Sequence, residues 1–175
     1  MLYVLQRDKL ENAPINIHQA RLALGVANTE SGVDFFIEAA CDFVESLSGY
    51  TITPSRYVIQ GNTVFDQELG YYIALPFPPI REVEKVEVLE GVNTYRELSQ
   101  DEYKLFDSGT KLILLNKNLA LVRVTYTAGY TNTTFPNDLF SHIVNVAYHF
   151  LMNREFPPPP ATLKRFTNHY LEKML

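Results

Sequence analysis

DFFIEAACDFVESLSG, residues 34–49, is the stretch with the most regular helical pattern in the chain. Apolar side chains in and next to it recur every three or four residues, at Val33, Phe36, Ile37, Ala40, Val44 and Leu47. Residues with this spacing share one face of a helix, so the pattern predicts an amphipathic helix over residues 31–48. Gly49 is a suitable end for it, because glycine adopts the left-handed conformation of a helix C-terminus without strain.

The opposite face of this helix carries an acidic stripe, formed by Asp34, Glu38, Asp42 and Glu45. At about 100° per residue, these four positions fall within an arc of about 80°. Like charges four residues apart destabilise an isolated helix by about 0.2–0.5 kcal/mol per pair. The acidic stripe is therefore a candidate interaction surface.

Three further segments have helical patterns. Residues 15–26 place apolar side chains at helical spacing and reach a glycine stop at Gly25. A helix is predicted to begin after Pro136, with Asp138 in its first turn, and the four prolines 157–160 stop it. Such a proline run favours a stiff, extended spacer. The last segment, 161–175, is predicted to be an amphipathic docking helix with an apolar stripe of Leu163, Phe166, Tyr170, Leu171 and Met174.

Between the helix predicted over residues 31–48 and the helix predicted after Pro136, the pattern changes to short runs of β type. The runs are RYVIQ (56–60), YYIAL (71–75), VEKVEVL (83–89), YKLF (103–106), KLILL (111–115) and ALVRVTY (120–126). Gly, Asn, Asp and Pro separate them, which predicts a compact antiparallel β region.

The predicted fold class is therefore α+β. We expect a mainly helical bundle of three to four helices, with a small antiparallel β region inserted between the second and third helices. Residues 1–156 are expected to form the core domain, including the β region 55–126. Residues 157–175 are expected to form the proline spacer and the docking helix.

Composition excludes several classes of function. Fifteen basic residues against 20 acidic ones give a net charge of −5, whereas proteins that grip phosphate backbones carry clustered basic surfaces. Tight nucleic-acid binding is therefore not expected. Cys41 is the only cysteine, which excludes an intramolecular disulfide and a thiolate zinc site. No stretch approaches the roughly 20 apolar residues of a transmembrane helix, so no membrane partner is expected.

Catalytic motifs are also missing from the sequence. It contains no GxSxG elbow, no Walker-type glycine loop and no GxGxxG turn. His142 and His149 are seven residues apart, a spacing that suits ordinary hydrogen bonds better than zinc coordination. We expect no catalytic, cofactor-binding or metal-binding residues, and no enzymatic activity. An enzyme with a scattered catalytic site is the alternative, and a ligand bound in a concave pocket would favour it.

Read in order, the chain resembles a known family at several segments: residues 34–49, the proline-rich strand entry LPFPPIREVEKVEV (75–88), VRVTYTAGY (122–130), FPNDL (135–139) and NRE (153–155). Together they resemble the head-tail connector, or adaptor, family of siphophage-type tailed bacteriophages. The resemblance spans residues 15–155, and within it residues 91–118 match no family pattern and form an insert of open role.

The resemblance implies a structural virion protein without enzymatic activity. Its subunits form a ring under the portal, usually a dodecamer in the virion, although the free chain can be a monomer. The ring extends the DNA channel and gives a platform for a downstream head-closure or tail protein, while DNA passes without specific binding. The location implied is the head-tail junction of a virion made in the bacterial host cytoplasm. The alternatives are another neck protein, for head closure or tail completion, and, less favoured, a small DNA-packaging or DNA-binding subunit.

Two hypotheses about surfaces follow. The acidic stripe either lines the channel, where it repels DNA, or meets a basic face of a neighbouring subunit. The docking helix packs on a neighbouring subunit or on the portal, at the reach that the proline spacer gives it.

Overall fold

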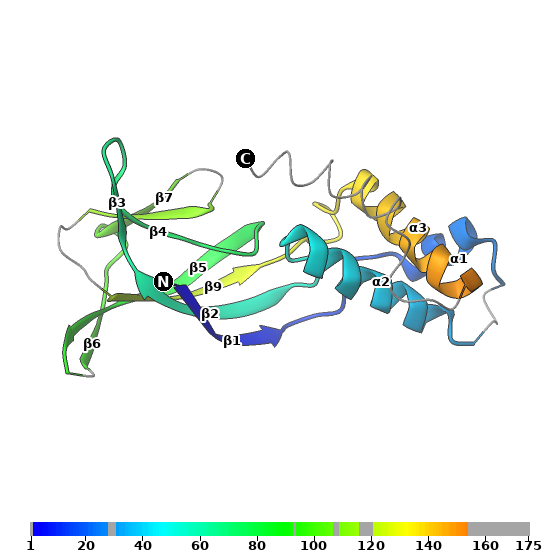
Figure 1. Ribbon diagram of the computed structural model, residues 1–175, viewed down its shortest axis with the longest axis horizontal. Helices are drawn as coiled ribbons and strands as arrows, with labels where there is room; N and C mark the ends of the chain where they lie inside the picture. Colours follow the sequence, from blue (N-terminus) through cyan, green and yellow to red (C-terminus); the bar gives the residue numbers. More distant parts are fainter. Residues whose placement is uncertain (1, 28–30, 93, 107–108, 116–120, 154–175) are drawn as a thin grey trace. The chain divides into compact units, whose positions relative to one another are not determined.

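A computed structural model describes residues 2–27, 31–92, 94–106, 109–115 and 121–153. The chain divides into two compact units, each built from segments that are far apart in the sequence (Figure 1). Residues 1–12 and 53–129 form the first, which we call the β unit. Residues 13–52 and 130–175 form the second, which we call the helical unit.

The β unit contains two antiparallel sheets. The order in the five-stranded sheet is β1 (Leu2–Lys9), β2 (Ser55–Asn62), β9 (Leu121–Ala128), β5 (Ile80–Gly91) and β6 (Thr94–Glu97). The order in the four-stranded sheet is β3 (Val64–Asp66), β4 (Gly70–Ala74), β8 (Lys111–Leu114) and β7 (Tyr103–Phe106).

Alternating side chains from the strands build the core of the β unit. In β2, for example, Ser55, Tyr57 and Ile59 are buried, whereas Arg56 is exposed and Val58 is only partly buried, because successive side chains point to opposite faces of a strand. The Tyr57 ring stacks between the rings of Phe77 and Tyr126, with centroids 5.0 and 5.4 Å away. Burial raises the pKa of the Tyr126 hydroxyl, which donates a hydrogen bond to the Pro76 carbonyl and so stays protonated inside the core.

The helical unit contains α1 (Ile17–Leu24), α2 (Val33–Ser48) and α3 (Asn137–Asn153). Asn16 caps α1, since its side chain accepts a hydrogen bond from the Gln19 N–H at 3.1 Å. Gly25 and Gly49 end α1 and α2 in the left-handed conformation, which confirms the two predicted stops. The apolar faces of the helices meet in a core that includes Ile37, Ala40, Val44, Ile143, Ala147 and Phe150.

The predicted fold class is wrong in its emphasis, because the protein is not a mainly helical bundle. Of the described residues, 40% lie in strands and 29% in helices, and two antiparallel sheets replace the small inserted β region. The strands are mostly four to eight residues long, so each one gives a weak pattern, whereas α2 and α3 give strong ones. β1 was not predicted at all, and the insert 91–118 contributes β6, β7 and β8.

Within the described residues, no helix combines the length and the apolar character that crossing a membrane requires.

Candidate functional site

The acidic stripe lies along α2, but its four carboxylates are not equivalent. Glu38 and Asp42, in the middle of the helix, are exposed, whereas Asp34 and Glu45 are partly buried. The sequence pattern placed the four residues on one face and could not show which of them serve the fold itself.

Asp34 forms an ion pair within the helical unit. Its Oδ1 lies 2.9 Å from Nε of Arg21, which comes from the last turn of α1. The Arg21 side chain is 11% exposed and also donates to the Ala27 carbonyl at 3.3 Å. Because a buried guanidinium is costly without hydrogen-bond acceptors, Asp34 ties the end of α1 to the start of α2.

Glu45 closes the other end of α2. Its Oε2 accepts a hydrogen bond from the backbone N–H of Ile52 at 2.7 Å, and Ile52 is fully buried. The carboxylate therefore fixes the segment that leaves the helix. Of the stripe, Glu38 and Asp42 are the residues with exposed side chains.

We expect Asp34→Ala to lower the free energy of unfolding by about 1–2 kcal/mol, because the buried Arg21 guanidinium loses its carboxylate while the exposed half of Asp34 is screened by water. Urea unfolding followed by circular dichroism measures this. Glu38→Ala on the same helix is the control, with a change within about 0.5 kcal/mol. The single variant Arg21→Met and the double variant Asp34→Ala/Arg21→Met complete a double-mutant cycle. If the double variant loses as much free energy of unfolding as the two single variants add up to, Asp34 and Arg21 are not coupled.

The predicted docking helix, Leu163, Phe166, Tyr170, Leu171 and Met174, and the proline spacer lie outside the described residues. They remain predictions, as does the domain boundary at residue 157.

The helical unit has a cleft of about 500 Å³ between the entry to α1 and the start of α3. Four amide side chains and two rings account for most of its lining: Asn16, Gln19, Asn132, Asn137, Phe135 and Phe140. Among the described residues, no charged side chain lines this cleft.

Metal-binding and nucleophilic chemistry have little basis in the part of the chain that the structure describes. There, no three side chains of His, Cys, Asp or Glu are grouped to hold a metal ion. Nδ1 of His149 lies 2.7 Å from the amide nitrogen of Asn153, an ordinary hydrogen bond within α3. Cys41 is 2% exposed and lies in the core of the helical unit, where a thiol is poorly accessible to reagents.

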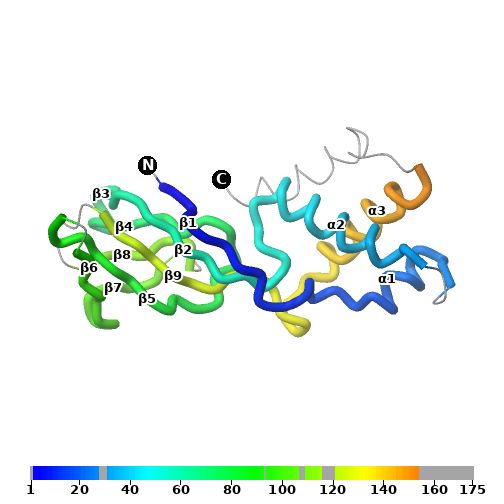
Figure 2. The backbone as a smooth tube through the Cα atoms, turned by 90° about the horizontal axis from the view of Figure 1, so that it is seen from below, coloured from blue at the N-terminus to red at the C-terminus, as the bar shows by residue number. Residues whose placement is uncertain are grey.

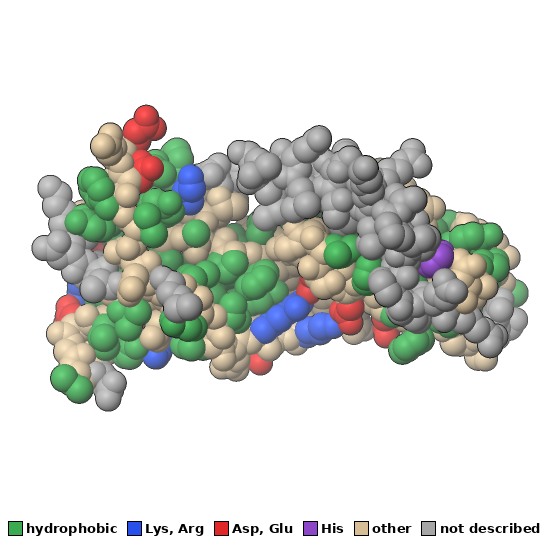
Figure 3. All heavy atoms as spheres, in the orientation of Figure 1, with side chains coloured by type: hydrophobic (Ala, Val, Ile, Leu, Met, Phe, Trp, Pro, Cys, Tyr) green, Lys and Arg blue, Asp and Glu red, His purple; other side chains and the backbone are tan. Residues whose placement is uncertain are grey.

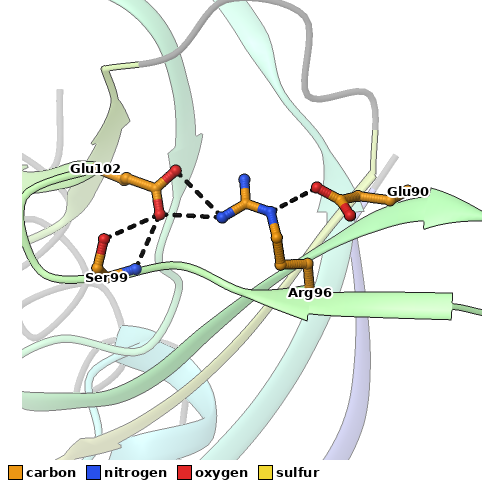
Figure 4. Close-up of polar contacts among 4 residues, drawn as sticks. All are labelled: Glu90, Arg96, Ser99 and Glu102. Carbon is orange, nitrogen blue, oxygen red and sulfur yellow. Dashed lines mark hydrogen bonds and ion pairs between the residues drawn. The ribbon is translucent and has the colours of Figure 1, made fainter.

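In the β unit, Arg96 of β6 joins a cluster of polar groups (Figure 4). Its guanidinium contacts Glu90 on one side and donates to both carboxylate oxygens of Glu102 on the other, at 3.0 and 3.2 Å. The same Glu102 carboxylate accepts from the backbone and hydroxyl of Ser99, both at 3.0 Å. These hydrogen bonds lower the pKa of Glu102 from 4.5 to about 2; the bond from Arg96 has the largest effect, and those from Ser99 come next.

The Glu102 contacts predict a specific acid sensitivity. Because the pKa of Glu102 is lower in the folded chain than in the unfolded chain, its contribution is complete above pH 4.5 and is lost as pH falls towards about 2. We expect wild type to be more stable than Glu102→Gln at neutral pH, and this difference to shrink between pH 4.5 and 2. Urea midpoints of both proteins across this range measure it. An unchanged difference at the lowest pH would contradict the assignment.

No protein-family model matches this sequence, and no curated protein matches it either. Solved structures do match its fold. A chain in the neck of an empty GTA particle, computed with C6 symmetry, is 14% identical, with a TM-score of 0.62 over 93% of this chain and 95% of that one. A chain in the neck of the native GTA particle, computed with C12 symmetry, is 16% identical, with a TM-score of 0.59 over 93% and 94%.

A third match is a chain in the virion of the native gene transfer agent (GTA) particle. It is 14% identical, with a TM-score of 0.60 over 93% of this chain and 95% of that one. All three likenesses cover both chains almost completely, so they include the β unit and the helical unit. At these identities they establish a shared fold.

Proposed function

We propose that this chain is a structural protein of the neck of a phage-like particle, and within the neck a head-tail adaptor subunit. The observation that carries the proposal is the shared fold with chains of GTA necks over 93% of this chain. The likeness includes two units of different architecture.

Other features support the same role. The segments that resemble the adaptor family belong to regular elements of the fold: residues 34–48 lie in α2, and residues 122–128 lie in β9. The net charge of −5 suits a subunit past which DNA slides without specific binding. The GTA necks were computed with C6 and C12 symmetry, which favours a ring of copies as the working form.

The test is co-sedimentation of the full chain with the portal ring encoded in the same gene cluster, followed by negative-stain electron microscopy. We expect a ring of added density that caps the portal. Clean separation of the two at micromolar concentration would overturn the adaptor role and leave head closure or tail completion as the neck functions to test. A chain that lacks residues 161–175 is the matched variant, expected to stay folded and to bind the portal more weakly if the docking helix reaches it.

The acidic stripe can be tested through its two exposed members. Glu38→Lys/Asp42→Lys is expected to leave the free energy of unfolding within about 0.5 kcal/mol, because both side chains are exposed. Asp34 and Glu45 stay unchanged because they serve the fold. If the stripe lines the channel, rings still form and retain DNA in a filter-binding assay. If it meets a neighbour, ring formation fails, and a compensating acidic substitution on the neighbour restores it.

A further inference from the structure

The cleft of the helical unit brings together two segments that are far apart in the sequence. Residues from 14–19, at the entry to α1, line it together with residues from 132–140, at the start of α3 (Figure 2). Its volume of about 500 Å³ lies within the range of pockets that hold small ligands. In the face of the molecule that Figure 3 shows, the charged side chains lie away from α1. Because burial of an unpaired charge is costly, a matching ligand is itself uncharged.

Amide side chains supply the cleft with hydrogen-bond donors. The amide groups of Gln19, Asn132 and Asn137 are exposed, and they make no hydrogen bonds within the described residues. Each such amide carries two N–H donors as well as its carbonyl acceptor. Phe135 and Phe140 add two aromatic rings to the lining. The cleft therefore offers several donors beside aromatic surface.

The sequence contains a segment that matches this chemistry, the four prolines 157–160. A proline residue has a backbone carbonyl but no N–H, so the run presents acceptors without donors, and it carries no charge. Proline-rich segments bind aromatic-lined grooves, because their preformed extended conformation loses little entropy on binding. The acceptors of the run therefore complement the donors and the rings of the cleft.

The whole run cannot lie in the cleft of its own copy. α3 ends at Asn153, and about 20 Å of helix separate that residue from Phe140, which lines the cleft. From Asn153 to Pro157 the chain spans at most about 14 Å, even when it is fully extended. The first proline is thus out of reach, whereas a second copy can supply all four.

We propose that the cleft binds the proline run 157–160 of a second copy of the chain. The run and the cleft are different surfaces, so the contact is head-to-tail, and contacts of this type repeat until a ring closes. The inference rests on the ring of the proposed function and names a contact that joins its subunits. The proline spacer then has a binding role of its own, besides setting the reach of residues 161–175.

Binding of a synthetic peptide tests the contact directly. The peptide covers residues 154–162, REFPPPPAT, with blocked ends, and the control peptide has alanine at the four proline positions. The full chain is attached at low density to a surface plasmon resonance chip, so that its copies do not meet. We expect saturable binding of the proline peptide and none of the alanine peptide. Absent binding, or equal binding of both peptides, would overturn the inference.

Isosteric variants test the amide donors of the cleft. Gln19→Glu/Asn132→Asp/Asn137→Asp removes three NH₂ groups and places carboxylates opposite the carbonyls of the peptide. We expect the affinity for the peptide to fall about tenfold or more. The melting temperature is expected to stay unchanged, because all three side chains are exposed. Asn145→Asp makes the same change at an exposed position of α3 outside the cleft, and we expect it to keep wild-type affinity. An unchanged affinity in the triple variant would place the peptide elsewhere and overturn the assignment.

Replacing the run within the chain tests which copy supplies it. The variant is Pro157→Ala/Pro158→Ala/Pro159→Ala/Pro160→Ala, attached to the chip in the same way as wild type. If the run binds only to a second copy, both chains bind the proline peptide with the same affinity. Weaker binding by wild type would show that its own run competes for the cleft, and would overturn the contact between copies.

The peptide measurement and the portal measurement separate this inference from the proposed function. Peptide binding by a chain that does not cap the portal would support the contact and overturn the adaptor role. Capping of the portal by a chain that does not bind the peptide would keep the role and overturn the contact.

Discussion

Gly129→Ala is expected to destabilise the β unit by about 2 kcal/mol or more, which is a large effect for one methyl group. Gly129 follows β9 with φ +116°, a conformation that L side chains rarely adopt. An alanine Cβ would also lie 2.8 Å from Cα and 3.0 Å from N of Pro54. These are backbone atoms of the residue just before β2, so they cannot turn away as a flexible side chain could. The Gly129 N–H meanwhile donates to the Pro79 carbonyl at 2.9 Å, which fixes the residue in place.

Gly70→Ala separates the two causes. Gly70 has φ +80°, and a Cβ added there would meet nothing within 4 Å. That variant therefore carries the conformational strain without the clash, at about 1 kcal/mol. Urea unfolding of both variants measures the difference. Equal losses would mean that the close approach to Pro54 does not matter. The clash also gives a physical reason for the AGY sequence at residues 128–130 in the adaptor-like segment.

Phe150→Ala is expected to cost the helical unit about 3–5 kcal/mol. The Phe150 side chain on α3 is fully buried, and its ring meets Phe43 of α2 edge to face, with centroids 5.8 Å apart. Removal of the ring leaves a cavity between the two longest helices and breaks the aromatic contact. The loss is measured as a shift of the urea midpoint in the helical circular dichroism signal.

Tyr148→Ala is the matched control for this prediction. Tyr148 lies on the same helix and is 50% exposed, so a similar loss of ring area is expected to change stability by about 0.5 kcal/mol or less. A loss at Phe150 below about 1 kcal/mol would mean that the α2 and α3 core collapses around the gap and is less rigid than described.

The helices were predictable from the sequence, because each signal is local. The apolar repeat and Gly49 predicted residues 31–48 for α2, and the structure has Val33–Ser48. The runs predicted as β type correspond to β2, β4, β5, β7, β8 and β9, whereas β3 and β6 were not predicted, and the share of strands in the fold was underestimated. Sheets depend on pairing between residues that are distant in the sequence. A pattern of four residues such as YKLF does not indicate which strand it pairs with. β1 was missed because its exposure on both faces removes the usual alternation.

The sequence predicted which acidic residues share one face of a helix, but not which contacts they make. Helical geometry places Asp34, Glu38, Asp42 and Glu45 on one face of the predicted helix, and all four lie in α2; their role as a surface stays a prediction. The sequence could not show that Arg21 binds Asp34 or that Ile52 binds Glu45, because these contacts depend on how the chain turns after α1 and after α2. For the same reason, the cleft of the helical unit gave no signal in the sequence, since its lining comes from two segments that only the fold brings together.

The position of β1 has a consequence for synthesis on the ribosome. β1 is translated well before its partner strand β2, because the paired residues range from Lys9 and Ser55 to Leu2 and Gly61. At about 5–20 residues per second, roughly 50 further residues take about 3–10 s to translate. During that time the run Leu2–Leu5 lacks its partner strand. A chaperone that binds emerging apolar segments would therefore meet this protein at β1 and release it when β2 emerges.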